Sequence, residues 1–279
     1  TSAMPREQAL PTRPLAVVTG AGSGIGRALA VEADRRGYRL LLCGRRLEAL
    51  QATRALLTSG DGLVVPADVT DPSGRLVIHR AVDGIGGSLD LLVHCAGLVQ
   101  PALLSETADH DLERMLQTNL AAPLLLTRDL RDPLAAAAGR IVFVGSTLGI
   151  IGHPYFSAYC ATKHGLYGLA DSLRRELAEE GIGVTYAAPR AVRTAASEGY
   201  SAIARALNMR MDAPEDVAAD IMNGVEKGVP TIYPRGMERI YIGIQRLFPG
   251  LIDQSLMQAG RKVRTAAATK VTALESAPG

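Results

Sequence analysis

Cysteine, tryptophan and long hydrophobic runs are scarce or absent in this chain of 279 residues. The three cysteines, Cys43, Cys95 and Cys160, are an odd number and lack the spacing of a zinc site, so we expect free thiols in a reducing compartment. No apolar run approaches the ~20 residues that a membrane-spanning helix needs, and residues 1–13 lack the apolar core of a signal peptide. We therefore expect a cytoplasmic protein without a metal site or a membrane-inserted segment.

An excess of charge of one sign is also lacking. The chain has 30 Lys and Arg against 28 Asp and Glu, a net charge of +2, and aromatic residues make up only 4% of it. No basic cluster is interleaved with aromatic residues, so we expect no nucleic-acid partner. Hydrophobic residues account for 47% of the chain and charged residues for 21%, which is typical of a soluble protein with a sizeable core.

The chain does contain a regular alternation of short apolar runs and helical patterns. The runs that predict buried strands occupy residues 15–19, 39–43, 62–66, 89–94, 140–145 and 183–188, with a weaker, proline-containing edge strand at 229–233. Helical patterns lie between them, for example at residues 25–36, 47–58, 73–84 and 157–180. This alternation predicts an α/β fold: a single-domain, Rossmann-type, doubly wound parallel sheet of about seven strands with helices on both faces.

A tyrosine and a lysine four residues apart, Tyr159 and Lys163, form the most informative pair in the sequence. On a helix they share one face, and an ammonium beside the phenol would lower its pKa from about 10. Ser146 follows the strand-like run at 140–145, from where it would reach the carbonyl oxygen that Tyr159 protonates. The three side chains together predict proton transfer to a substrate oxygen, whereas the tyrosine and lysine alone would also suit a buried tyrosine near a surface lysine.

A glycine-rich turn lies between the first predicted strand and a predicted helix. It has the pattern Thr-Gly-x-x-x-Gly-x-Gly, with Thr19, Gly20, Gly24 and Gly26 at the fixed positions. Glycines permit a tight turn and a close backbone approach to a pyrophosphate, whose charge the helix N-terminus favours. The turn therefore predicts a dinucleotide site.

These motifs, in this order, resemble those of the classical short-chain dehydrogenase/reductase family over about residues 14–235. The resemblance implies a catalytic tetrad of Asn119, Ser146, Tyr159 and Lys163, in which Lys163 also holds the nicotinamide ribose and Asn119 anchors a water. It also implies an adenine contact at Asp68 and a nicotinamide contact at Thr194. The predicted cofactor-binding residues are Thr19, Gly20, Gly22, Ser23, Gly24, Ile25, Gly26, Arg45, Arg46, Asp68, Val69, Ala96, Gly97, Tyr159, Lys163, Pro189, Val192 and Thr194.

Two positions depart from the family pattern. His94 and Cys95 stand where the family has two asparagines, which argues against a polar side-chain role there. Arg190 replaces the glycine that usually follows Pro189, and we expect it to shift the loop that carries Thr194. Neither departure touches the residues predicted to transfer the proton.

The end of the second predicted strand decides between the two nicotinamide cofactors. An acidic residue there pairs with the ribose hydroxyls of NAD, whereas an arginine holds the 2′-phosphate of NADP. The family's NAD-selecting aspartate would fall near Gly44, where this chain has no acid and continues with Arg45 and Arg46. The sequence therefore predicts NADP(H), with NAD(H) as the alternative if both arginines are merely solvated.

The substrate side of the predicted pocket is less specific. Residues 148–156 are apolar, which suits a hydrophobic carbonyl such as a long-chain ketoacyl or sterol-like compound but equally suits packing beneath the pocket. His153 is either a third acid or a structural loop residue. The resemblance implies that residues 190–211, which mix charged residues with alanines, form a mobile lid.

We divide the chain into a flexible N-terminus (1–13), a catalytic domain (14–235), a helical extension (236–264) and a flexible tail (265–279). The segment 237–264 has apolar residues at helical spacing and several arginines. It either packs on the core or a second subunit, or is an amphipathic element that shields the pocket or contacts a membrane surface peripherally. The resemblance implies a homodimer or homotetramer formed through helices near 110–130 and 157–180.

The expected function is that of an NADP(H)-dependent oxidoreductase that interconverts a carbonyl and a secondary alcohol, with Tyr159 as general acid and base. Two alternatives are an isomerase or dehydratase that uses the same tyrosine, and a catalytically silent NADP(H)-binding regulatory or scaffold protein. The glycine spacing argues against the first. The second would be expected to have lost Tyr159 or Lys163, and both are present.

Overall fold

The computed structural model describes residues 13–275, and it describes side chains as far as residue 264. The predictions for residues 1–12 and 276–279 lie outside the described residues. Within them, none of the helices is both long enough and apolar enough to cross a membrane.

Seven parallel strands form one sheet in the order β3-β2-β1-β4-β5-β6-β7, as the alternating pattern predicted. The strands are β1 (Leu15–Thr19), β2 (Arg39–Gly44), β3 (Gly62–Pro66), β4 (Leu91–His94), β5 (Arg140–Val144), β6 (Gly183–Ala187) and β7 (Thr231–Ile232). Four strands are shorter than predicted: β4 and β7 start two residues later, and β5, β6 and β7 each end one residue earlier. The Leu89 amide donates to the Pro133 carbonyl and not to a neighbouring strand. The Val229 amide donates to the Gly224 carbonyl. Strands β4 and β7 therefore start later than predicted.

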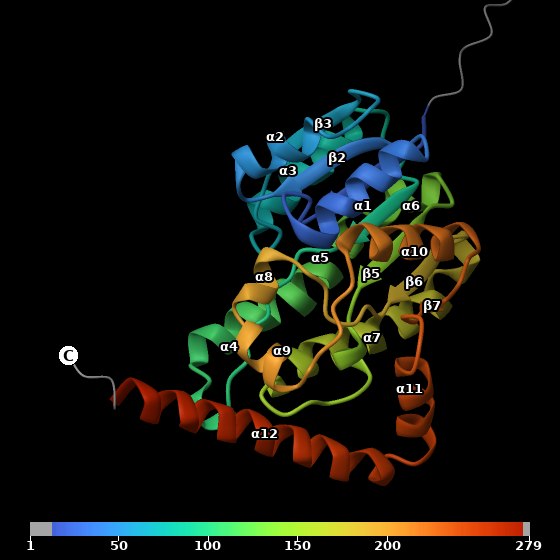
Figure 1. Cartoon of the computed structure of the whole chain (residues 1–279). Coiled ribbons are helices and arrows are strands. Elements are labelled where there is room, and N and C mark those ends of the chain that lie inside the picture. The colour runs from blue at the N-terminus through green and yellow to red at the C-terminus, as the bar shows by residue number, and fades with distance from the viewer. Residues whose placement is uncertain (1–12, 276–279) are drawn as a thin grey trace, which may run out of the picture.

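The central strands are mainly apolar because helices cover both faces of the sheet (Figure 1). Along β1, Leu15 and Val17 belong to one hydrophobic cluster, whereas Ala16 and Val18 belong to the other, as the alternation of side chains in a strand requires. Helices α1 (Gly24–Arg35), α2 (Leu47–Arg54) and α10 (Pro214–Glu226) contribute to the second cluster. Helices α3 (Pro72–Asp83), α5 (Ala122–Asp129) and α7 (Ser157–Glu176) contribute to the first.

The remaining elements lie in the connections. They are α4 (Asp109–Leu116), a π-helical turn (Gln117–Ala121), α6 (Arg131–Ala136), α8 (Ala195–Glu198), α9 (Ser201–Ala206), α11 (Glu238–Leu247), α12 (Gly250–Glu275), and single 3₁₀ turns at Leu104–Glu106, Thr147–Gly149 and Ala178–Glu180. Helix α12 runs past α9 along the lower edge of the molecule (Figure 1) and continues beyond residue 264.

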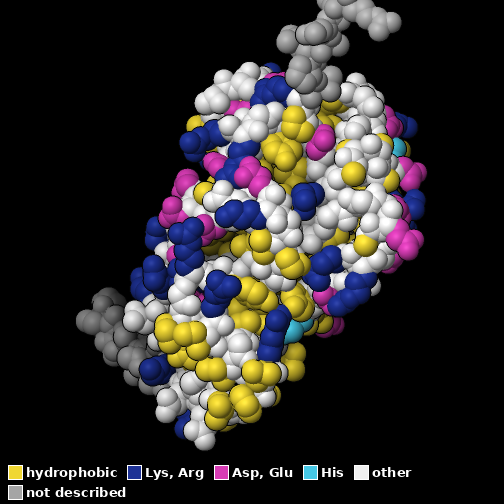
Figure 2. Space-filling model, turned by 90° about the vertical axis from the view of Figure 1, so that its right-hand side faces the viewer, with side chains coloured by type: hydrophobic (Ala, Val, Ile, Leu, Met, Phe, Trp, Pro, Cys, Tyr) yellow, Lys and Arg dark blue, Asp and Glu magenta, His cyan; other side chains and the backbone are white. Residues whose placement is uncertain are grey.

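The residues that the structure describes leave part of the α11–α12 pair uncovered. Leu247, Phe248 and Leu251, at the corner between the two helices, are 73%, 61% and 72% exposed. Ile242 and Ile252, in contrast, are buried. Figure 2, seen from the side that carries α11 in Figure 1, shows hydrophobic side chains gathered at the lower end with lysines and arginines among them.

Candidate active site

A cavity of about 1170 Å³ lies beyond the carboxyl ends of the strands, between the loops that follow β1 and β4. This is the point where the strand order reverses, at which doubly wound sheets bind ligands. Most sequence-predicted site residues line the cavity: Gly20, Gly22, Ser23, Gly24, Ile25, Arg45, Arg46, Asp68, Val69, Ala96, Gly97, Ser146, Tyr159, Lys163, Pro189, Val192 and Thr194. The other three, Thr19, Gly26 and Asn119, are not among the lining residues and lie behind them.

The glycine-rich turn is locked to the loop after β4. Gly20 has a positive φ of 69°, and a Cβ there would lie 2.8 Å from the Ala96 amide nitrogen. A Cβ at Gly26 would overlap the Gly20 carbonyl, so α1 packs onto the turn only with glycine at this position. The Thr19 hydroxyl accepts hydrogen bonds from the Cys95 and Ala96 amides. The first turn of α1 is thereby exposed to the cavity, without an acidic side chain, and fits a pyrophosphate.

Charges for the nucleotide half of a cofactor lie at the ends of β2 and β3. Arg45 and Arg46 are exposed and line the cavity. Asp68 is fixed by the Thr70 amide and hydroxyl, at 2.9 and 2.7 Å. Partial burial raises the pKa of Asp68, but the Thr70 hydrogen bonds and the Arg45 charge outweigh it and hold that pKa below its usual range. A charged carboxylate beside two guanidinium groups suits the polar and phosphate groups of an adenosine moiety.

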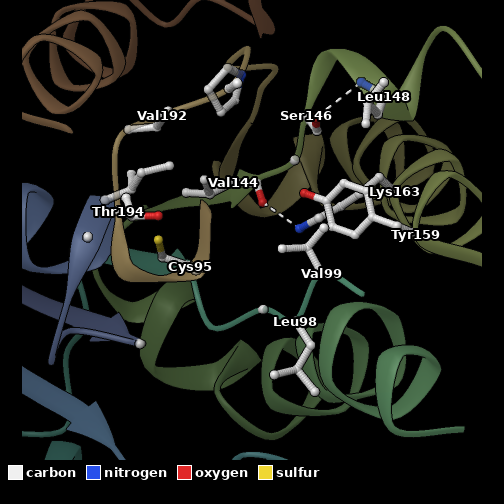
Figure 3. A pocket seen from close by; sticks show the side chains of 18 of the residues that line it. Cys95, Leu98, Val99, Val144, Ser146, Leu148, Tyr159, Lys163, Val192 and Thr194 are labelled. Atoms are coloured by element: carbon white, nitrogen blue, oxygen red, sulfur yellow. Dashed lines mark hydrogen bonds between the residues drawn. The ribbon is translucent and has the colours of Figure 1, made fainter. Parts of the chain in front are cut away.

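Three predicted catalytic side chains converge at the other end of the cavity (Figure 3). Ser146 lies two residues beyond the end of β5, and Tyr159 and Lys163 project from the same face of the first turns of α7. The Ser146 hydroxyl accepts the Leu148 amide at 3.1 Å and also hydrogen-bonds Tyr159. Lys163 Nζ donates to the Val144 carbonyl at 3.0 Å and lies 5.6 Å from the centroid of the Tyr159 ring.

The protonation behaviour of this group differs from the sequence-based prediction. Burial raises the pKa of the Tyr159 phenol, and the hydrogen bond with Ser146 only partly offsets this. Burial also lowers the pKa of Lys163 to about 8. In the chain alone the pKa of Tyr159 is therefore raised and not lowered as predicted, because burial of the phenol is the largest effect on it.

Asn119 lies in the π-helical turn between α4 and α5 and is buried. Its amide oxygen accepts the Leu98 amide at 2.7 Å, and its amide nitrogen donates to the Leu98 carbonyl and the Thr162 hydroxyl. The side chain thus ties the loop after β4 to α7, one residue before Lys163. A Cβ at Gly97 would be 3.4 Å from Asn119 Oδ1 and 3.7 Å from Lys163 Nζ, so both polar atoms reach the same point.

The structure corrects one expectation about the departures from the family pattern, because the His94 side chain does have a polar role. His94 bonds the Thr127 hydroxyl at 2.8 Å and stacks on Phe143, and burial lowers the pKa of His94 to about 3, so it is a neutral core residue. Arg190 is 9% exposed and forms ion pairs with Asp212 at 2.7 Å and Glu238 at 2.6 Å. Arg190 therefore fastens the loop after β6 to the start of α11, a link that the sequence analysis did not find.

Comparison with known proteins agrees with this geometry. Residues 14–203 match the family model for short chain dehydrogenases. The chain belongs to the short-chain dehydrogenase/reductase family. It is therefore an NAD(P)-dependent oxidoreductase, and the seven-stranded sheet is the Rossmann-type sheet of that family.

Members of several kinds resemble this short-chain dehydrogenase/reductase. It is 30% identical to the mouse (Mus musculus) dehydrogenase/reductase SDR family member 7B, over 93% of this chain and 85% of the relative. It is 34% identical to the 3-oxoacyl-[acyl-carrier-protein] reductase FabG of Haemophilus influenzae, over 66% of this chain and 76% of that protein. A Sphingobium yanoikuyae short-chain dehydrogenase in complex with NADPH superposes with a TM-score of 0.74 at 25% identity, covering 86% of this chain and 95% of the other.

Several apolar residues of the segment 148–156 line the dehydrogenase/reductase cavity. Leu148, Ile151 and Phe156 line it, as the sequence predicted, and Phe156 meets Tyr200 edge to face. His153 also lines the cavity, with Nδ1 at 2.9 Å from the Pro154 carbonyl oxygen. Helix α12 also contributes lining residues, namely Ile252, Ser255, Leu256 and Ala259. Shielding of the pocket was one of the two interpretations of the segment 237–264, but the sequence did not indicate which of its residues would line the cavity.

The two ends of the segment predicted to be a lid are joined by backbone contacts. Val192 forms an isolated bridge with Asp212, supported by hydrogen bonds from the Arg193 amide to the Asp212 carbonyl and from the Asp212 amide to the Ala191 carbonyl. Thr194 lines the cavity and caps the short helix α8. Helices α8 and α9 thus project from a fixed base over the cavity.

Proposed function

We propose that this protein interconverts a carbonyl and a secondary alcohol on a hydrophobic substrate, using NADP(H), with Tyr159 as general acid and base. The observation that carries the proposal is the convergence of Ser146, Tyr159 and Lys163 at the apolar end of a cavity whose other end fits a dinucleotide. No second function has an observation in its favour, since all four tetrad residues are present.

Bound NADP(H) supplies or accepts the hydride. In the reductive direction Tyr159 gives its phenolic proton to the carbonyl oxygen, and Ser146 donates a hydrogen bond to the same oxygen. Burial raises the pKa of Tyr159, which keeps the phenol protonated and ready to donate. Lys163, with a pKa of about 8, exchanges protons near neutral pH and restores the phenol. It also holds the nicotinamide ribose, and Asn119 anchors the water that connects Lys163 to solvent.

The cofactor choice rests on the end of β2. Two exposed guanidinium groups, Arg45 and Arg46, line the cavity where a 2′-phosphate would lie, and Gly44 leaves no carboxylate to repel it. The remaining proposed cofactor contacts are the turn after β1, Asp68 and Val69, Ala96 and Gly97, and the loop from Pro189 to Thr194.

The substrate class follows from the lining of the other end. Leu148, Ile151 and Phe156 line the same cavity as Ile252 and Leu256 of α12, so apolar side chains are available for a substrate there. A ketoacyl or sterol-like carbonyl suits such a lining, and the resemblance to FabG, a 3-oxoacyl-[acyl-carrier-protein] reductase, favours the ketoacyl class.

We also propose a cytoplasmic homodimer or homotetramer. The three thiols are free, which suits a reducing compartment. Leu116 and Leu124, on α4 and α5, are 38% and 44% exposed and would be covered by a partner subunit. The uncovered face of α11 and α12 would allow peripheral contact with an anionic membrane surface. Co-sedimentation of the protein with anionic vesicles tests this contact.

The deciding experiment is oxidation of NADPH and, in parallel, NADH by the purified protein, with ketoacyl thioesters of increasing chain length and ring ketones. We expect turnover that prefers NADPH and rises with chain length. Absence of turnover across the panel, together with tight NADPH binding in a fluorescence titration, would instead support a silent cofactor-binding protein.

A further inference from the structure

A tyrosine that the proposed reaction does not use lies directly beneath the catalytic residues. Tyr186, in β6, is fully buried. Its phenol oxygen accepts the Ser146 amide at 3.2 Å and lies 3.2 Å from the Ser146 carbonyl oxygen and 3.3 Å from the Lys163 carbonyl oxygen. One hydroxyl therefore contacts the backbone of two members of the tetrad, on two different elements.

The chain leaves room for this ring by having glycine at two positions. A Cβ at Gly145 would overlap the Tyr186 ring, and a Cβ at Gly149 would overlap its hydroxyl. Gly145 precedes Ser146, and Gly149 ends the turn that follows it. The phenol thus fills the space that side chains of the Ser146 loop would otherwise occupy, and the loop is seated on it.

The hydroxyl has one proton, so it donates to either the Ser146 or the Lys163 carbonyl while accepting the Ser146 amide. Burial raises the pKa of Tyr186, so the phenol keeps this proton at neutral pH. The ring is held from the other side by Tyr167 of α7, edge to face at 5.0 Å. The phenol can therefore transmit the position of β6 to both the Ser146 loop and α7.

We propose that Tyr186 is a positioning residue that sets the separation of the Ser146 hydroxyl from Tyr159 and Lys163. This proposal rests on the proposed function, because it concerns the geometry of proton transfer. Tyr159 lies one turn before Lys163 on α7, so a brace between the Lys163 backbone and Ser146 fixes the place where the substrate oxygen is held. Loss of the hydroxyl would leave the ring in its cavity but release this link.

The test is Tyr186→Phe, which removes only the hydroxyl, with Tyr167→Phe as the matched control. Tyr167 belongs to the same ring pair, but its hydroxyl accepts Arg246 at 2.5 Å and is not bonded to the tetrad. Turnover is measured per NADPH-binding site, so that partly unfolded protein does not count. We expect Tyr186→Phe to lower kcat about tenfold, with KM for NADPH within about twofold, and Tyr167→Phe to leave both unchanged.

A second readout separates positioning from a loss of stability. Misaligned donors slow the chemical step, so the isotope effect with NADPH deuterated at the transferred position should rise in Tyr186→Phe, and the pH profile of kcat should shift. A kcat per site within twofold of the wild type, with the same isotope effect and pH profile, would overturn the proposal. Absence of turnover in the wild-type protein would count against the proposed function instead.

The packing of the Tyr186 ring against the Ser146 loop can be tested by a stability measurement, without an activity assay. Gly145→Ala should lower the melting temperature by about 5 °C or more in the wild-type background, because the methyl group overlaps the Tyr186 ring. In a Tyr186→Val background the same substitution should cost much less. Equal losses in the two backgrounds would show that the loop is not seated on this ring.

Discussion

Replacing Lys163 by methionine should stabilise the protein while abolishing its activity. The side chain of Lys163 is almost fully buried, and burial lowers its pKa from 10.5 to about 8. At about 1.4 kcal/mol per pH unit, the charged lysine lowers the free energy of unfolding by about 3 kcal/mol at pH 7. Methionine keeps the apolar stem but removes the donor to the Val144 carbonyl, a loss of about 1 to 2 kcal/mol. The net gain is about 1 to 2 kcal/mol.

The sign of the pH dependence provides the decisive comparison. A basic group whose pKa is lower in the folded than in the unfolded state reduces the free energy of unfolding. The reduction is complete below the folded pKa, and it disappears as the pH rises to the unfolded pKa. The advantage of Lys163→Met should therefore be constant below pH 8 and shrink between pH 8 and 10.5.

Urea unfolding of both proteins, without added cofactor, at pH 7 and at pH 9.5 measures this. Lys227→Met, at an exposed lysine, serves as the control and should show no such trend. A Lys163→Met protein less stable than wild type at pH 7, or an advantage that does not shrink at pH 9.5, would refute the reasoning.

Three other substitutions probe the rest of the site. Tyr159→Phe should reduce turnover by about 10² to 10⁴ and leave NADPH affinity within a few-fold; a mutant that retains most of its activity would remove the tyrosine from the mechanism. Arg45→Ala should raise KM for NADPH about tenfold or more with KM for NADH nearly unchanged, and equal effects on both cofactors would contradict a phosphate contact. Glu238→Gln should weaken the ion pair that attaches α11 to Arg190. We expect KM for long-chain substrates to rise about fivefold and proteolysis near residue 238 to become faster. Unchanged KM and cleavage would show that this ion pair does not hold α12 at the pocket.

The sheet and most of the cavity lining could be predicted because their signals are local. An apolar run, a glycine turn or a pair of residues four apart on a helix depends only on neighbouring positions. The strand at 15–19 was predicted to the residue, and the glycine-rich turn lies beside the cavity as expected. Where the prediction of a strand overran, at Leu89 and Val229, a hydrogen bond from outside the sheet decided the boundary.

The features that the sequence did not reveal depend on contacts between distant segments. Arg190 was noticed as a departure from the glycine of the family, but its partners are 22 and 48 residues away. The wall formed by α12 depends on where the α11–α12 corner turns the chain. The pKa of Tyr159 was predicted in the wrong direction, since burial of the phenol outweighs the hydrogen bond with Ser146, and burial is a property of the whole fold.

The dependence of Gly145 on Tyr186 also has a consequence for how this sequence can change over time. A side chain larger than hydrogen at residue 145 overlaps the ring, and a smaller residue at 186 leaves a hole beneath the loop. Each single substitution is therefore unfavourable, whereas a paired exchange restores the packing. Descendants of a common ancestor should thus differ at these two positions together, and an alignment should show glycine at 145 mainly where an aromatic residue occupies 186.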